Sequence, residues 1–210
     1  MELFINITLY SGIIPLIILL LKKIAFNFKE PIVPFIWVTA IASAYEILNL
    51  GLFEINLSYW FQIYPFLEIL GLYFFFFNLF KGKYKLIINL LFIVLLILYC
   101  FSFTLWENNE TSLQSHSVNK SSITLCVIIG CFIWFRNLVK NMEVENLWKL
   151  PDFYFISAIL IYYSSTVLLF SLGSFIYTGV ELYEYWWINI LATLILRILL
   201  TIGTWKIKFK

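Results

Sequence analysis

The strongest constraint on the fold is a series of apolar runs, each about as long as a bilayer is thick. Seven runs follow one another along the 210 residues: 3–21, 31–53, 58–80, 86–106, 121–139, 153–175 and 185–205. A helix needs roughly 20 apolar residues to cross the hydrocarbon core of a membrane. The sequence therefore predicts an all-α, single-domain bundle of seven transmembrane helices joined by short links.

Composition supports a membrane protein over any soluble class. Apolar residues make up 62% of the chain and charged residues 12%, against about 45–50% and 25% in soluble domains. We expect the lipid bilayer as the surrounding partner and no nucleic-acid partner. The three cysteines, Cys100, Cys126 and Cys131, fall inside apolar runs, where cysteine usually acts as a small packing residue.

Positive charges alternate between the two sides of the predicted bundle. Of 14 Lys and Arg residues, all except Lys120 and Arg197 lie at the ends of the first, third, fifth and seventh runs. The N-terminus and the other links carry glutamates, including Glu54 and Glu110. Because cytoplasmic links are enriched in Lys and Arg, we expect the N-terminus outside and the C-terminus in the cytoplasm.

A polar segment separates the fourth and fifth runs. Residues 107–120, ENNETSLQSHSVNK, show no clear hydrophobic periodicity, which is typical of a solvated connection. The sequence thus predicts an outer loop that contains His116 and Lys120.

Three ionisable residues fall well inside the apolar runs: Glu46, Glu68 and Arg197. Each costs about 2.5–3.5 kcal/mol at the centre of a membrane helix, so such groups usually pair. At about 1.5 Å per residue, Glu68 lies roughly 15 Å and Arg197 roughly 18 Å from the outer ends of their runs. The matched depths predict an ion pair between Glu68 and Arg197.

Two polar stripes accompany these charges. Thr39, Ser43, Glu46 and Asn49 share one helical face, and Asn189, Thr193, Arg197 and Thr201 recur every fourth residue along the last run. We expect the second, third, sixth and seventh helices to enclose a polar cavity. The predicted site residues are Glu46, Asn49, Tyr64, Glu68, Tyr162, Asn189, Thr193 and Arg197. The cavity has three interpretations: a polar network that only fixes helix register, a ligand or signal site, or an ion or proton pathway.

No motif indicates enzymatic chemistry. His116 is the single histidine, and the chain has no HExxH and no glycine-rich phosphate loop. The last run has no lysine at mid-membrane depth that could hold retinal. We therefore expect no catalytic residues, no metal site and no cofactor, and we favour a protein that is not an enzyme.

Several short motifs resemble a known family. They are Glu46, Tyr64 with Glu68, Pro151-Asp152-Phe153, Ile161-Tyr162-Tyr163-Ser164, Leu169-Phe170 and Gly203-Thr204-Trp205. Together they resemble a family of small, uncharacterised seven-helix proteins of the bacterial inner membrane, often encoded beside two-component regulators. The resemblance implies a sensory or regulatory role with a membrane partner such as a sensor kinase.

The sequence therefore predicts a receptor-like or accessory protein of the bacterial cytoplasmic membrane that acts in signalling through a partner. The alternative is a small transporter or an ion or proton pathway that uses Glu46 and Glu68. The oligomeric state stays open at this point.

Overall fold

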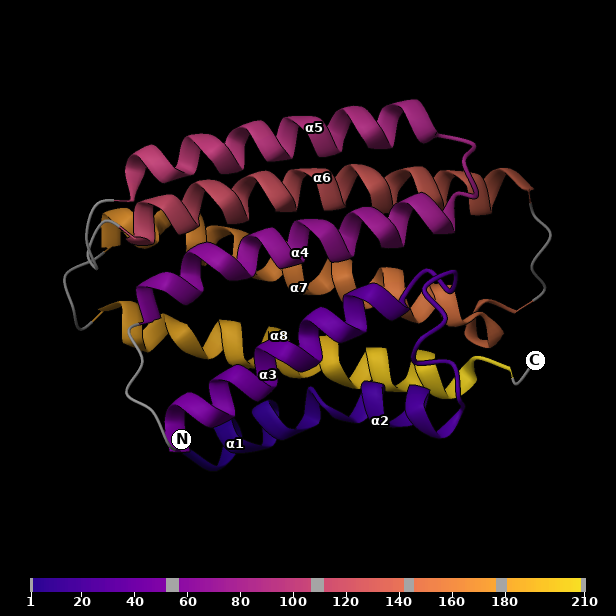
Figure 1. The fold of residues 1–210 in the computed structure, drawn as a ribbon, viewed down its shortest axis with the longest axis horizontal. Coiled ribbons are helices and arrows are strands. Elements are labelled where there is room, and N and C mark those ends of the chain that lie inside the picture. Colours follow the sequence, from indigo (N-terminus) through magenta and orange to yellow (C-terminus); the bar gives the residue numbers. More distant parts are fainter. Residues whose placement is uncertain (1, 52–56, 107–111, 142–145, 177–180, 209–210) are drawn as a thin grey trace.

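The computed structural model describes residues 2–51, 57–106, 112–141, 146–176 and 181–208, and all regular structure in these ranges is helical (Figure 1). The helices are α1 (Glu2–Ser11), α2 (Ile14–Leu21), α3 (Val33–Gly51), α4 (Leu57–Leu79), α5 (Lys85–Ser102), α6 (Ser112–Asn141), α7 (Pro151–Ile176) and α8 (Glu181–Lys206). Short 3-10 helices lie at Phe103–Leu105 and Leu147–Lys149. α1 and α2 form one pass along the bundle. Because every regular element of the described residues is a helix, the all-α prediction is confirmed.

Six of these passes are long and apolar enough to cross a membrane. They are Phe4–Leu21, Gln62–Leu79, Lys85–Leu105, Gln114–Lys140, Pro151–Ser171 and Trp186–Lys206. The apolar part of α3, Val33–Asn49, is shorter. The length and apolar composition of these helices are therefore those of a membrane protein. A seventh crossing through α3 stays a prediction.

The helices form a ring with one helix outside it. α8 packs against α7, α7 against α6, α6 against α4, and α4 against α3, while α1 and α2 contact both α3 and α8. α5 lies on the outside against α4 and α6 (Figure 1). Burial follows this arrangement, since 17% of the residues in the α5 span are buried against 56% in α7. The inside of the ring is where polar groups can escape lipid.

The two ends of the bundle differ in charge. Figure 1 shows the chain starting at one end and finishing at the other. The described segments at the second end, hereafter the basic end, carry most of the lysines: Lys22, Lys23, Lys29, Lys81, Lys83, Lys85, Lys149, Lys206 and Lys208. Lys22 also joins the first pass to the last, because its Nζ donates to the carbonyls of Thr204, Trp205 and Ile207 at 3.1, 2.6 and 2.6 Å. A cation there suits the negative end of α8.

The apolar core fills the half of the ring nearer the basic end. Its most buried members come from all parts of the ring: Leu19, Val33, Ile36, Ile69, Phe75, Ile123, Phe155, Ile159 and Leu200. The half nearer the N-terminus is packed less completely, and the polar residues gather there.

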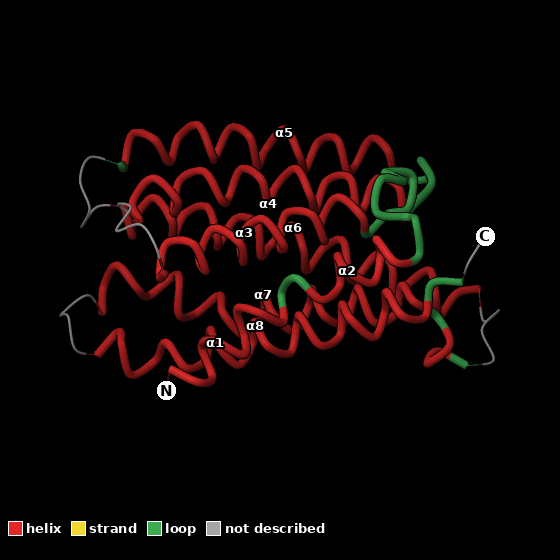
Figure 2. The backbone as a smooth tube through the Cα atoms, turned by 60° about the horizontal axis from the view of Figure 1, so that its bottom comes forward, coloured by secondary structure: helices red, strands yellow, loops and turns green. Residues whose placement is uncertain are grey.

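Two boundaries differ from the sequence prediction. α6 begins at Ser112, nine residues before the predicted start, so His116 and Lys120 belong to a helix and the predicted outer loop is wrong for residues 112–120. The first pass is interrupted between α1 and α2, where Figure 2 shows a short loop. Gly12 lies at this break and Pro15 in the first turn of α2, a position that tolerates the missing N–H of proline.

Candidate functional site

A polar cavity of about 400 Å³ lies inside the ring, in the half nearer the N-terminus. Residues of α1, α3, α4, α7 and α8 surround it. The polar lining residues are Thr8, Thr39, Glu46, Asn49, Trp60, Tyr64, Tyr162, Trp186, Asn189, Thr193 and Arg197, and the apolar ones are Ile5, Leu9, Ala42, Ile190 and Leu196. The size falls within the range of small-molecule sites, about 300–1,000 Å³.

Every residue of the predicted site except Glu68 lines this cavity. The two stripes read from the sequence face each other across it, with Glu46 and Asn49 on α3 and Asn189, Thr193 and Arg197 on α8. Tyr64 of α4 and Tyr162 of α7 complete the set. The periodicity of the stripes therefore located the wall residues, although it says nothing about what they bind.

Glu68 pairs with Lys120, and the predicted ion pair between Glu68 and Arg197 is wrong. Lys120 Nζ lies 2.7 Å from both carboxylate oxygens of Glu68. Both side chains are almost fully buried, with 1% of Glu68 and 3% of Lys120 exposed. A charge as deep as this needs a partner at hydrogen-bonding distance, and Lys120 supplies it from α6.

Four aromatic rings enclose the Lys120 ammonium. The rings of Tyr64, Tyr162, Tyr163 and Phe170 lie with centroids 4.9, 5.6, 5.7 and 5.5 Å from Nζ. Cation–π attraction within about 6 Å of a ring favours the charged amine in a place without water. The pair and its rings, hereafter the lysine cage, fix α4, α6 and α7 around one point.

The sequence predicted a loop at Lys120 because the start of α6 is polar. Its buried face nevertheless follows a helical spacing, with Ser115 and His116, then Asn119 and Lys120, then Ile123 and Thr124. Pairs that repeat every four residues are the mark of one helix face. A search for helical periodicity in polar as well as apolar residues would have extended the helix to this point.

The break in the first pass lies against Arg197. Gly12 N–H bonds to Leu9 O at 3.2 Å instead of to Thr8 O, the partner it would have in a continuous α-helix. The freed Thr8 carbonyl accepts from Ser11 Oγ at 2.7 Å and from Arg197 Nη1. Irregular backbone at membrane depth is tolerated where it is buried or lines a cavity and its groups are satisfied. Arg197 therefore stabilises the interrupted helix.

Gly12 permits this approach. A Cβ atom at position 12 would overlap Ser43 Oγ and would lie 2.9 Å from Arg197 Nε. Only a residue without a side chain leaves room for α1, α3 and α8 to meet here.

Glu46 and Arg197 face the same cavity without forming an ion pair. Within the described ranges, no nitrogen of Arg197 lies within 4.0 Å of the Glu46 carboxylate, and that carboxylate accepts no hydrogen bond from a described residue. Two opposite charges in one half-buried space are thus left for water or a ligand to satisfy.

The cavity and the lysine cage share two walls. Tyr64 and Tyr162 line the cavity and also lie beside the Lys120 ammonium. The buried Tyr163 hydroxyl has no hydrogen-bond partner among the described residues. The rings of Tyr64 and Tyr162 would therefore separate a ligand in the cavity from the buried Glu68–Lys120 ion pair.

Some wall residues were absent from the predicted site. Thr8 belongs to the first pass, which was not among the helices predicted to enclose the cavity. Trp60 and Trp186 also line the cavity and were not among the predicted site residues. Trp60 stacks on Tyr45 with ring centroids 4.0 Å apart and lies 5.5 Å from Tyr64. These aromatic rings thus form part of the cavity wall.

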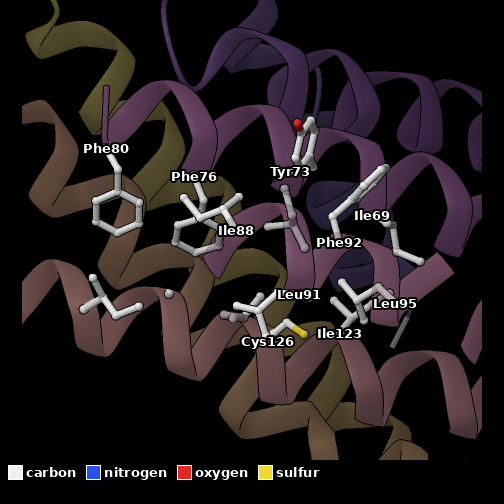
Figure 3. Close-up of a pocket in the computed structure, with 14 residues that line it drawn as sticks. Ile69, Tyr73, Phe76, Phe80, Ile88, Leu91, Phe92, Leu95, Ile123 and Cys126 are labelled. Atoms are coloured by element: carbon white, nitrogen blue, oxygen red, sulfur yellow. The ribbon is translucent and has the colours of Figure 1, made fainter. Parts of the chain in front are cut away.

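A second, smaller pocket of about 40 Å³ lies between α4, α5 and α6 (Figure 3). Figure 3 shows apolar side chains around it, among them Phe76, Phe92, Leu95 and Ile123, with the sulfur of Cys126. It contains no charged residue, so it offers packing space and no chemistry.

The described residues hold no group of three or more His, Cys, Asp or Glu side chains placed to bind a metal ion.

The fold and the cavity define a helical membrane protein with a polar intramembrane chamber. Comparison with protein families, with curated proteins and with solved structures finds no match to the chain. The resemblance to a seven-helix family therefore stays a prediction.

Proposed function

We propose that this protein is a receptor-like membrane protein that binds a small polar ligand in the chamber between α1, α3, α4, α7 and α8. The observation that carries the proposal is the pair of charges, Glu46 and Arg197, that face one cavity without neutralising each other. A network that only fixed register would gain most by pairing them, because unpaired buried charges are costly.

The proposal includes orientation and place. The basic end carries the cations that cytoplasmic links favour, so it faces the cytoplasm, with seven crossings, the N-terminus outside and the chamber in the outer half. We place the protein in a bacterial cytoplasmic membrane, in keeping with the family that its motifs resemble. The described links at the basic end are short, which leaves the output of a bound signal to a partner protein such as a sensor kinase.

Labelling of cysteines tests whether the chamber is open to water. In a variant with the three native cysteines changed to alanine, Thr193→Cys should react from outside with a membrane-impermeant thiosulfonate. Ile195→Cys is the control. Ile195 lies on the outer surface of α8 and is 41% exposed, so under this proposal it faces lipid and should not react from outside in cells. Failure of Thr193→Cys to react in cells and in detergent would sink the proposal of a ligand chamber.

The interrupted first pass favours a second candidate function, a small transporter or an ion or proton pathway. Broken helices beside a mid-membrane site are typical of secondary transporters, and here the break at Gly12 lies against Arg197. Glu46 is the better relay group, since Glu68 is held by Lys120.

Flux measurements separate the two candidates. Proteoliposomes loaded with a pH-sensitive dye would report proton or sodium-coupled flux, which a transporter should lose in Glu46→Gln. A receptor should show no flux, and should instead co-purify with a membrane partner. Flux that disappears in Glu46→Gln would replace the receptor proposal with the transporter.

A further inference from the structure

We infer that the chamber is built for a zwitterion, a small molecule that carries an ammonium group and an anionic group such as a carboxylate or a phosphate. The inference rests on the proposed function and adds the chemical class of the ligand. It follows from the separation of charges, from unsatisfied acceptors and from the aromatic wall.

The charges of the chamber favour a ligand that carries both signs. The chamber is lined by one anion, Glu46, and one cation, Arg197, which do not pair with each other. A purely anionic ligand would satisfy Arg197 and leave Glu46 facing it, and a purely cationic ligand would do the reverse. Each would add a like-charge contact in a place with little water, where such contacts are expensive. A ligand with both charges compensates both residues.

The chamber also contains hydrogen-bond acceptors without donors, which an N–H group of a ligand can satisfy. Asn189 Oδ1 is buried and has no hydrogen-bond partner among the described residues. The Glu46 carboxylate also accepts no hydrogen bond within the described part of the chain. A buried acceptor such as Asn189 Oδ1 is almost always bonded in native proteins, and the half-buried Glu46 carboxylate faces the same space. An ammonium group carries three donors, and both acceptors line the same chamber on the facing helices α3 and α8.

Aromatic side chains form part of the chamber wall. Trp60, Tyr64 and Trp186 line the chamber, and Trp60 is held in place by its stack on Tyr45. Faces of Trp and Tyr attract ammonium groups. The neighbouring lysine cage binds an ammonium group in the same way, since one carboxylate and four aromatic rings surround the amine of Lys120.

Arg197 is the natural anchor for the anionic group. Its Nη1 is engaged by the Thr8 carbonyl, and the remaining guanidinium donors make no other hydrogen bond to the described residues. A guanidinium presents five donors and favours carboxylate and phosphate oxygens. Thr193 lies one turn before it on α8 and adds a hydroxyl to the same wall.

Two sources of such a ligand share this chemistry: a free zwitterion from outside the cell and the headgroup of an aminophospholipid. Thermal unfolding of the purified full chain in a nonionic detergent can compare them. The probes are phosphoethanolamine and leucine as free zwitterions, dihexanoyl phosphatidylethanolamine as the lipid, glycerol 3-phosphate as anion only and ethanolamine as cation only. We expect at least one zwitterion to raise the unfolding midpoint, and neither single-charge probe to do so at the same concentration.

Variants make the test specific. Glu46→Gln should weaken zwitterion binding by at least about tenfold and remove the preference over glycerol 3-phosphate. Arg197→Gln should weaken it similarly and remove the preference over ethanolamine. Tyr73→Phe is the control, because the Tyr73 hydroxyl bonds to Asn89 outside the chamber, and it should bind as the wild type does.

The bound zwitterion should also protect Thr193→Cys from the thiosulfonate, which links binding to the chamber even where a variant is poorly stable. The inference is wrong if glycerol 3-phosphate or ethanolamine binds at least as tightly as the best-binding zwitterion. It is also wrong if no zwitterion binds, or if none protects Thr193→Cys. Reaction of Thr193→Cys without any probe would still support the chamber, so the two failures can be told apart.

Discussion

Lys120 carries its charge into the interior of the bundle and there determines how the other buried charges are shared. With Glu68 held at 2.7 Å, Arg197 is left to the Thr8 carbonyl and to the chamber. Glu46 then remains as the acid of the chamber. Because Lys120 lies in a helix and not in a loop, the roles predicted for Glu46, Glu68 and Arg197 change.

Loss of the Lys120 charge should be among the most destabilising single changes in the chain. Lys120→Met leaves Glu68 buried without a cation, which should cost about 3–5 kcal/mol. Lys83→Met is the matched control at an exposed lysine of the basic end, and should change stability by less than about 0.5 kcal/mol. Unfolding in mixed detergent micelles measures both, and equal effects of the two variants would contradict the lysine cage.

Gly12 controls the contact of three helices at the break in the first pass. Gly12→Ala places a methyl group on Ser43 Oγ and should cost about 1–3 kcal/mol through overpacking. Because that hydroxyl oxygen is the nearest atom, Ser43→Ala in the same chain should restore part of the loss. A double variant no more stable than Gly12→Ala would show that the three helices do not meet in this way.

At the scale of whole elements, α6 is the helix whose extent the sequence obscured. Its first turns are polar, yet they carry a buried face of Ser115, His116, Asn119 and Lys120. His116 packs edge-on against Phe170 of α7, with ring centroids 5.0 Å apart. Ser115 Oγ donates to Gln62 Oε1 of α4 at 2.6 Å, so the extended part of α6 is held on two sides.

Cysteine labelling distinguishes a helix from a loop in this segment. In the cysteine-free background, Gln114→Cys should react rapidly with an impermeant thiol reagent, because Gln114 is exposed, whereas His116→Cys should react slowly, because position 116 is 5% exposed. A solvated loop would label at both positions. Equal rates at the two sites would therefore favour the loop and contradict the extended α6.

At the scale of the whole molecule, the sequence was sufficient for the bundle and for the walls of the chamber. Apolar runs of membrane length leave few alternatives to helices, and period-four stripes located residues such as Glu46 and Arg197 on facing walls. The pairing inside was not predictable from depth alone. Helices at the same depth differ in their neighbours, and neither the ring order nor the place of α6 beside α4 follows from hydropathy.

Reporter fusions test the seven crossings and their direction. Alkaline phosphatase fused after position 54, 110 or 180 should be active, because that enzyme folds only outside the cytoplasm. Green fluorescent protein fused after position 82, 144 or 210 should fluoresce from the cytoplasmic side. If α3 did not cross the membrane, phosphatase fused after position 54 would be inactive, and the orientation of one end of the chain would be reversed.

Double-mutant cycles among Glu68, Lys120 and Arg197 measure most directly how the buried charges are shared. The variants Glu68→Gln, Lys120→Met and Arg197→Gln, alone and in pairs, would be unfolded in mixed micelles. We predict a coupling free energy above about 1 kcal/mol between Glu68 and Lys120, and below about 0.5 kcal/mol between Glu68 and Arg197. Strong coupling of Glu68 to Arg197 with none to Lys120 would contradict the arrangement on which the chamber and its ligand depend.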